Sequence, residues 1–148
     1  MPMISFDDID PDLRAGVAAL AEDMRDGGYQ RHDPVREIFG LLGDKWTTLI
    51  LLVLRIGRWR HADLRRILSR LGSEEGISQR MLTLKLRALE RQGMVIRTAT
   101  QDVPPKVSYE LSELGKNLAG QAQGLILWVR QNRPAIDAAR AAFDAREA

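Results

Sequence analysis

Residues 76–111 read GISQRMLTLKLRALERQGMVIRTATQDVPPKVSYEL, and this stretch decides the fold. Ser78 is typical of a helix N-cap, the apolar residues after it repeat with helical spacing, and Gly93 marks the end of that helix. From Val95 to Leu111 the apolar residues alternate instead, on both sides of a loop that contains two prolines. The stretch therefore predicts one helix followed by a two-stranded β-hairpin.

Helices are also expected on both sides of this stretch. Upstream, prolines or capping residues followed by apolar residues at helical spacing predict four helices, which begin near Pro11, Pro34, Asp44 and Ala62. Glycines mark the ends of the first three, at Gly27, Gly43 and Gly57. Between the third and fourth helices, Arg58–Arg60 can form one edge strand. Downstream, Ser112 caps a long helix and Pro134 interrupts it, which gives two terminal helices at 112–133 and 134–146.

This order of elements is that of a winged helix-turn-helix, in which a helix pair is followed by a β-hairpin wing, and few small folds share it. The predicted fold class is mainly α (α+β), a winged helix-turn-helix domain with a two-stranded β wing and flanking helices. Single domains cluster at roughly 100–150 residues, so the length of 148 residues agrees with one domain of this size.

The charges are unevenly distributed along the chain. The formal net charge is only +2, but residues 33–111 hold fourteen Lys and Arg against nine Asp and Glu, whereas residues 1–32 hold three against seven. A basic central segment suggests a polyanionic partner such as nucleic acid, and an ordinary solvated surface is the alternative.

Composition argues against catalysis and against a membrane. The chain has no cysteine and two histidines, and it shows no nucleophile triad, phosphate loop or metal-ligand spacing, so we expect no enzyme activity, no cofactor and no metal. The longest apolar run, Leu49–Leu54, is far shorter than the roughly 18–20 residues of a spanning helix. The N-terminus lacks the basic start and apolar segment of a signal peptide. We expect a soluble, cytoplasmic protein with no membrane partner.

The helix that begins after Ser78 has two chemically different faces. At 100° per residue, Leu82, Leu86 and Leu89 fall on a packing side together with Met81, whereas an exposed strip collects Arg80, Thr83, Leu84, Arg87 and Arg91, with Gln79 at its start. Arginine suits guanine or phosphate, glutamine suits adenine, and threonine or leucine carbons can meet a thymine methyl. Glu90 is the only acid on this helix, which favours a polyanion over the alternative of a solvated face with ordinary salt bridges.

Motifs between residues 33 and 118 resemble, in order and spacing, those of the HxlR family of bacterial winged helix-turn-helix transcriptional regulators. The matching pieces are DPV at 33–35, GDKW at 43–46, LRR at 64–66, GISQRMLT at 76–83, LRALE at 86–90, GMVIR at 93–97, VPPKVSYEL at 103–111 and LG at 114–115. The GISQRMLT run followed by the VPPKVSY run is the most specific part of the resemblance.

The resemblance implies a homodimer that binds a two-fold-related, palindromic operator in double-stranded DNA. Residues 78–92 would then form the recognition helix and residues 95–111 the wing. It also implies three parts of the chain, namely an N-terminal arm and dimerisation helix at 1–32, the winged helix-turn-helix DNA-binding domain at 33–111, and C-terminal dimerisation helices at 112–148.

The residues expected to contact DNA combine the exposed strip with positions carried over from the family. They are Ser78, Gln79, Arg80, Thr83, Leu84, Arg87 and Arg91 on the recognition helix, Arg97 and Lys106 on the wing, and Lys45 at a helix start beside the DNA backbone. Lys45 could equally be a solvated lysine beside Asp44.

Sensing by a thiol is impossible in this chain. The family commonly has a cysteine where this sequence has Asp33, and several members sense oxidants through that thiol, whereas here the residue is a carboxylate. A small-molecule effector is one remaining possibility, with Trp46 and Trp128 as candidate contacts. Core packing for Trp46, and a dimer interface or plain packing for Trp128, are the alternatives.

Two function hypotheses remain. The first is a homodimeric DNA-binding repressor or activator, with tuning by a small-molecule effector as an option. The second is a winged-helix module for protein–protein contacts without DNA binding of its own. Salt-sensitive binding to duplex DNA separates them, because the first hypothesis requires it and the second excludes it.

Overall fold

The computed structural model describes residues 5–26, 33–72 and 75–148. The chain divides into two compact units, residues 1–41 and 42–148. The predicted end of the first helix at Gly27 lies outside the described residues, as do Ser73 and Glu74. Among the residues described, no helix is long and apolar enough to cross a membrane.

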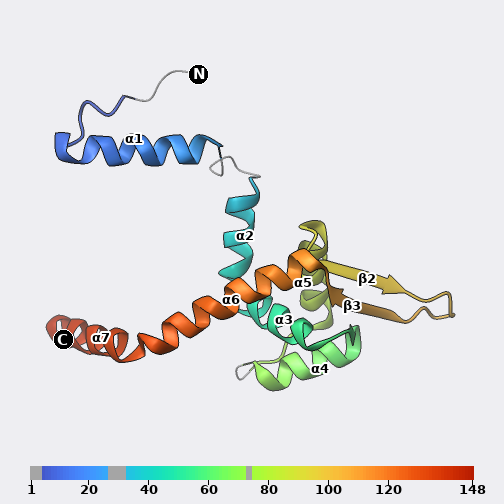
Figure 1. Ribbon diagram of the computed structural model, residues 1–148. Helices are drawn as coiled ribbons and strands as arrows, with labels where there is room; N and C mark the ends of the chain where they lie inside the picture. The colour runs from blue at the N-terminus through green and yellow to red at the C-terminus, as the bar shows by residue number, and fades with distance from the viewer. Residues whose placement is uncertain (1–4, 27–32, 73–74) are drawn as a thin grey trace. The chain divides into compact units, whose positions relative to one another are not determined.

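The first unit contains two helices, α1 (Pro11–Asp26) and most of α2 (Pro34–Leu42) (Figure 1). Both begin at the prolines that the sequence indicates, and an aspartate caps each of them. Asp10 Oδ1 accepts the N–H of Asp12 at 2.9 Å, and Asp33 Oδ1 accepts the N–H of Val35 at 2.8 Å. The carboxylate that replaces the family's cysteine therefore serves as a helix cap.

The second unit contains the remaining helices and all strands of the described chain. They are α3 (Lys45–Ile56), β1 (Trp59–Arg60), α4 (His61–Leu71), α5 (Gln79–Arg91), β2 (Val95–Ala99), β3 (Val107–Leu111), α6 (Glu113–Gln131) and α7 (Arg133–Glu147). The predicted N-caps Asp44, Ser78 and Ser112 are confirmed, since each side chain accepts backbone N–H groups of the helix that follows. Gly93, which follows α5, has φ +79°, a conformation that favours glycine over residues with a β-carbon.

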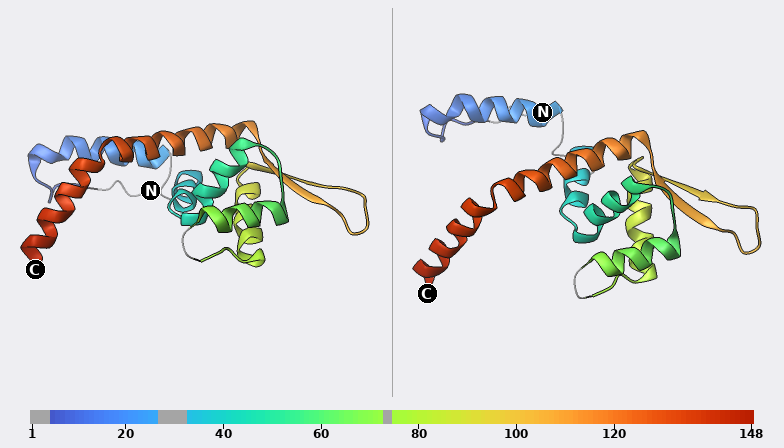
Figure 2. Two further views of the ribbon diagram at one scale, coloured as in Figure 1. Left: turned by 90° about the horizontal axis from the view of Figure 1, so that it is seen from below. Right: turned by 60° about the horizontal axis from the view of Figure 1, so that its bottom comes forward.

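The sheet is antiparallel with strand order β1-β3-β2. The predicted hairpin is confirmed: β2 pairs with β3 so that Arg97 lies opposite Tyr109, and Figure 2 shows the hairpin projecting away from the helices. The predicted edge strand at Arg58–Arg60 is also confirmed, as β1, because Trp59 pairs with Tyr109 from the other side of β3. The fold is thus a winged helix-turn-helix with a small antiparallel sheet.

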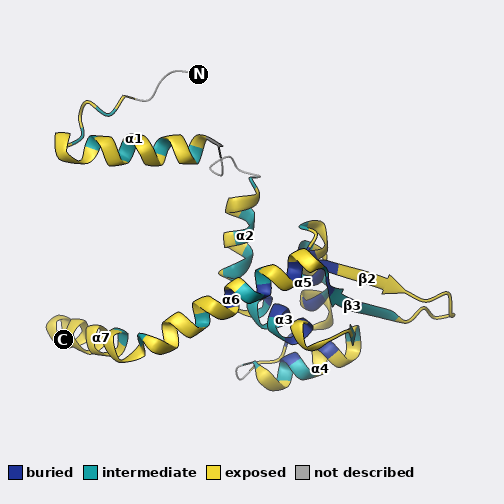
Figure 3. Ribbon diagram, viewed as in Figure 1, coloured by how far each residue is buried: buried dark blue, intermediate teal, exposed yellow. Residues whose placement is uncertain are grey.

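The core lies where α3, α4, α5, the strands and the first half of α6 meet (Figure 3). Leu82, Leu86 and Leu89 are fully buried, as the helical periodicity predicts. The prediction that Met81 lies on the packing side is wrong: its side chain is 42% exposed. The buried face of α5 is narrower than the periodicity suggested, so position 81 lies beyond its edge.

Candidate nucleic-acid interface

A groove with a volume of about 730 Å³ lies between α5 and the wing. Three segments that are distant in the sequence line it: Gln79, Thr83 and Arg87 from α5; Arg60, His61 and Ala62 from β1 and the start of α4; and Arg97, Pro105, Lys106, Val107 and Tyr109 from the hairpin. The α5 residues are four positions apart, so they form one line along the helix. Five of the expected DNA-contact residues thus meet in one place.

The lining of the groove is strongly cationic. Arg60, Arg87, Arg97 and Lys106 face it, and no carboxylate lines it. Among the residues that the structure describes, none of these four side chains makes a hydrogen bond or an ion pair. Four cations around one groove without anionic partners create a positive potential that attracts a polyanion.

The other expected residues of α5 lie outside the groove. Arg80, Leu84 and Arg91 are exposed on an adjacent surface of the helix, which we call the outer strip, and Leu84 is 51% exposed there. Ser78 lies at the start of α5, where its Oγ accepts the N–H of Met81 at 3.1 Å. The single exposed strip expected from the sequence is therefore two surfaces, one that lines the groove beside the wing and one that lies outside the groove.

His61 fixes the hydroxyl of Thr83. The His61 Nε2 atom lies 3.0 Å from Thr83 Oγ1, and that same oxygen lies 2.9 Å from the carbonyl oxygen of Gln79. A carbonyl can only accept, so the hydroxyl proton goes to Gln79 and His61 must donate Nε2–H to Thr83. Burial, together with the charge of Arg65, lowers the pKa of His61, which favours the neutral ring.

This hydrogen-bond arrangement determines what Thr83 can offer a ligand. Its only proton is taken by the backbone, so the hydroxyl cannot donate to a base or a phosphate. The γ-methyl group of Thr83 takes part in no hydrogen bond and can make apolar contacts in the groove. No local pattern in the sequence indicates this contact of His61, because its partner is 22 positions away.

Side chains of α4 hold the backbone of the segment that precedes α5. Arg65 Nε donates to the carbonyl oxygen of Ile77 at 3.0 Å, and Ser69 Oγ accepts the N–H of Ile77 at 3.3 Å. The side chain of Ile77 is itself buried, 3% exposed. The start of α5, including Gln79, is thereby fixed relative to α4.

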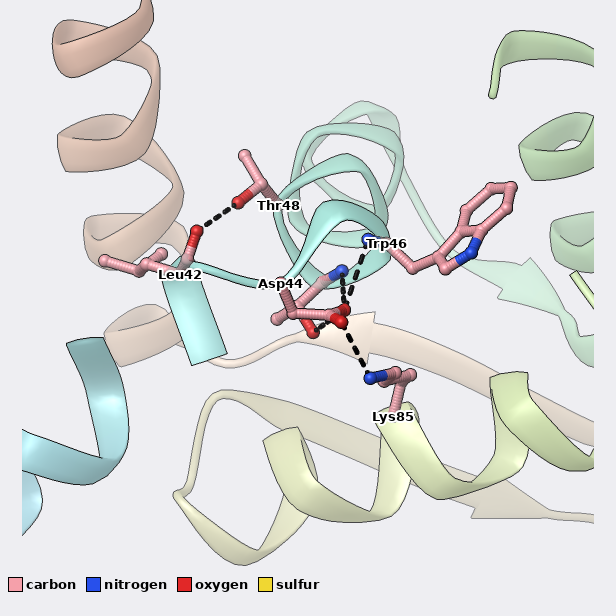
Figure 4. Close-up of polar contacts among 6 residues, drawn as sticks. Leu42, Asp44, Trp46, Thr48 and Lys85 are labelled. Atoms are coloured by element: carbon pink, nitrogen blue, oxygen red, sulfur yellow. Dashed lines mark hydrogen bonds and ion pairs between the residues drawn. The ribbon is translucent and has the colours of Figure 1, made fainter. Parts of the chain in front are cut away.

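An ion pair ties α5 to α3 (Figure 4). Lys85 Nζ lies 2.8 Å from Asp44 Oδ1, while Asp44 Oδ2 accepts the N–H groups of Trp46 and Thr47. Burial would raise the pKa of Asp44, but the bonds from Lys85 and Thr47 outweigh it and lower that pKa. Lys85 was missed by sequence reasoning, because its partner is 41 positions away.

Lys45 and the two candidate effector residues lie apart from the groove. Lys45 is exposed at the start of α3, with Nζ 5.1 Å from the centroid of the Trp46 ring. Trp46 is half-buried, and its ring would meet any β-carbon added at Gly72. Trp128 is 55% exposed on α6. None of the three lines the groove.

The chain is similar to a known family of proteins. The profile of the HxlR-like helix-turn-helix family matches residues 41–137. The HTH-type transcriptional regulator YtfH of Escherichia coli (strain K12) is 35% identical over 123 residues, which are 82% of this chain and 93% of that protein.

Solved structures of transcriptional regulators are similar to this chain. The transcriptional regulator YtfH of Salmonella typhimurium superposes with a TM-score of 0.63 at 34% identity, covering 78% of this chain and 98% of that one. The redox regulator HypR in its reduced form superposes with a TM-score of 0.59 at 35% identity, covering 72% and 99%. The family and these relatives are transcriptional regulators rather than enzymes. With its helix-turn-helix and wing, this chain belongs to the HxlR family of DNA-binding transcriptional regulators.

Proposed function

We propose that two copies of this chain bind a palindromic operator, with α5 in the major groove and the wing against the neighbouring sugar-phosphate backbone. One observation carries the proposal: the groove between α5 and the wing is lined by four cations and no carboxylate. A nucleic-acid backbone supplies the anionic partners that these side chains lack within the described chain. The outer strip adds exposed arginines that can reach base edges.

The terminal helices support a homodimer. On the second half of α6 and on α7, large apolar side chains are exposed, namely Leu125, Leu127, Trp128, Val129 and Phe143, each between 42% and 61%. Several large apolar side chains left exposed on neighbouring helices favour a surface that associates with another chain. We assign this interface to residues 112–148 and, with α1, to residues 1–32, which leaves residues 33–111 to bind DNA.

Two-fold symmetry sets the spacing of the operator. If both recognition helices enter successive major grooves on one face of the duplex, the half-site centres lie about 34–36 Å apart. Ser78, Gln79, Arg80, Thr83, Leu84, Arg87 and Arg91 then address each half-site. Arg97 and Lys106 hold the backbone at the wing, and Lys45 contacts it at the start of α3.

The regulation that we propose acts through a small molecule, with Trp46 or Trp128 as the contact, and not through oxidation. HypR is a redox regulator, but this chain contains no cysteine. Treatment with the thiol oxidant diamide should therefore leave operator affinity unchanged, measured by fluorescence anisotropy with labelled duplex. A fall in affinity after treatment would contradict this prediction.

Binding to duplexes selected from a random pool tests the proposed function. The affinity for the selected operator should fall steeply with salt, because binding releases counterions from the phosphates. Arg80→Ala and Arg87→Ala should each weaken specific binding by about 1–3 kcal/mol if the guanidinium is bidentate to a base. Lys106→Ala should weaken binding to all sequences alike.

Arg55→Ala is the matched control, since Arg55 is exposed at the end of α3, outside the groove, the outer strip and the proposed dimer interface. It should bind like the parent. If the variants at Arg80, Arg87 and Lys106 also bind like the parent, the proposal is wrong. A complete lack of salt-sensitive duplex binding would favour the alternative, a winged-helix module for protein–protein contacts.

A further inference from the structure

The densest positive charge of the chain is not on the recognition helix. Residues 55–70, which include β1 and most of α4, contain six arginines and a single acid, Asp63. On α5, by comparison, one of the four cations, Lys85, is already paired with Asp44. The proposed reading of DNA by α5 and the wing uses only Arg60 of the six arginines.

Part of this charge lines a second hollow, between β1 and α4, with a volume of about 340 Å³, which we call the arginine cleft. Arg58, Arg60, Arg66 and Arg70 line it together with Asp63. Asp63 is paired with Arg66 at 3.3 Å, and both side chains are more than half exposed. Within the described chain, the other three arginines have neither a carboxylate partner nor a hydrogen-bond acceptor.

The arginine cleft is continuous with the groove beside α5. Arg60 lines both of them. A third hollow of about 540 Å³ joins them by a second route, because Arg66 and Arg70 line it together with His61 and Gln79, which also line the groove. One connected basic surface therefore runs from the wing past the start of α5 and across α4 to β1.

This continuity indicates what kind of ligand the arginine cleft binds. Guanidinium groups bind phosphates through paired hydrogen bonds, and a row of them fits evenly spaced phosphates. A small anion would satisfy one site and leave the others unpaired. A duplex that already occupies the groove extends past it, so its backbone can reach Arg58 and Arg70 without a further partner.

We propose that the arginine cleft binds the phosphate backbone of DNA flanking each operator half-site, so that the protein contacts more DNA than its recognition helices read. This inference rests on the proposed function, because the flanking DNA is brought to the cleft by the duplex in the groove. Arg58 and Arg70 are the residues to test, since neither lines the groove.

The experiment compares two duplexes, the selected operator trimmed to its half-sites and the same operator extended by roughly one helical turn, about 10 base pairs, at each end. The parent should bind the extended duplex more tightly and with a steeper salt dependence. In Arg58→Ala/Arg70→Ala the slope of log K against log salt should fall by about 0.9 for every phosphate that the variant no longer neutralises, on the extended duplex alone.

Control variants separate charge from stability. Arg58→Lys/Arg70→Lys keeps the charge and should retain most of the extra slope. Arg36→Ala/Arg55→Ala removes two exposed arginines outside the cleft, the groove and the proposed dimer interface, and should bind both duplexes like the parent. The unfolding midpoint of Arg58→Ala/Arg70→Ala should match that of the parent, because both side chains are exposed.

Two results would overturn the inference. One is a parent that binds both duplexes with the same affinity and slope, which would leave an acidic protein as the class of ligand to examine. The other is a double variant that loses affinity equally on both duplexes, which would place these arginines inside the half-site contact. A parent that binds neither duplex would instead refute the proposed function itself.

Discussion

The two halves of α6 are one continuous helix but have opposite surroundings. In the first half, Gly115, Ala119 and Ala122 are buried against the winged helix-turn-helix body. In the second half, Leu125 and Trp128 are 61% and 55% exposed, which Figure 3 shows as the change from blue and teal to yellow along the helix. The buried positions of the first half are therefore small residues, whereas large apolar residues of the second half are exposed.

The first half of α6 packs against the winged helix-turn-helix body, whereas the second half leaves large apolar side chains exposed. Small side chains let the backbone of α6 approach the elements it packs on. Ser112 donates its hydroxyl to the carbonyl oxygen of Gly93 at 2.6 Å and its N–H to that of Met94 at 3.0 Å. Large apolar residues beyond Gly124 add nothing to this packing, so they suit a surface that a second copy covers.

The largest effect of a substitution is a loss of stability at Gly115, where the first half of α6 packs most closely. A β-carbon at Gly115 would lie inside the van der Waals contact distance of the Met94 carbonyl oxygen, and backbone cannot yield as a side-chain end can. Gly115→Ala should lower the free energy of unfolding by about 3 kcal/mol or more. Urea denaturation followed by circular dichroism measures this.

Gly120→Ala is the matched control on the same helix. A β-carbon there would meet no atom within 4 Å, so the better helix propensity of alanine should raise stability by up to about 1 kcal/mol. Equal effects of the two substitutions would show that Gly115 is not at a tight contact, and the first half of α6 would then pack less closely on the body than described.

The next largest effect concerns the exposed half. Trp128→Ala should leave unfolding of the body unchanged and weaken dimerisation by about 2 kcal/mol, roughly thirtyfold in the dissociation constant, as for a buried aromatic anchor of an interface. Sedimentation equilibrium measures the dissociation constant. Gln123→Ala, on an exposed position of the same helix, is the control and should dimerise like the parent. A parent that is monomeric at all concentrations would remove the dimer from the proposed function.

The sequence patterns predicted those structural features that depend on residues close together along the chain. The caps Asp44, Ser78 and Ser112 and the hairpin are local, since each is fixed by residues within a few positions. The buried leucines of α5 follow from helical periodicity. Most of the fold could therefore be predicted from the sequence alone, and so could membership of the family.

What the sequence could not provide depends on tertiary placement. The exposed strip on α5 divides into a groove-facing line and an outer strip because the wing lies beside it, and the register that puts Arg97 opposite Tyr109 is not encoded in α5. The contacts of Lys85 and His61 join residues 41 and 22 positions apart. No local pattern distinguishes these side chains from solvated ones.

The smallest expected effect is a pH dependence of the unfolding free energy. It should arise in the body and not in the exposed half of α6. His61 is the only histidine of residues 42–148, so the exposed half of α6 has no histidine to titrate near neutral pH. Burial and the nearby Arg65 lower the pKa of His61 from its ordinary value of 6.5, so the folded body favours the neutral ring. Its contribution to stability is complete above pH 6.5 and is lost as pH falls through the lowered pKa.

His61→Gln tests this assignment, because its amide can still donate to Thr83 Oγ1 but does not titrate in this range. Between pH 7.5 and 5 the unfolding free energy of the parent should fall more than that of His61→Gln, while the dimer dissociation constants of both should show no such difference. Asp44 does not interfere, because its pKa lies below 3.8 and its stabilising ion pair with Lys85 is lost only in more acidic solution. Parallel stability curves for the two proteins would contradict the neutral His61 ring, and a pH-dependent difference in dimerisation would contradict the separation of the body from the exposed half of α6.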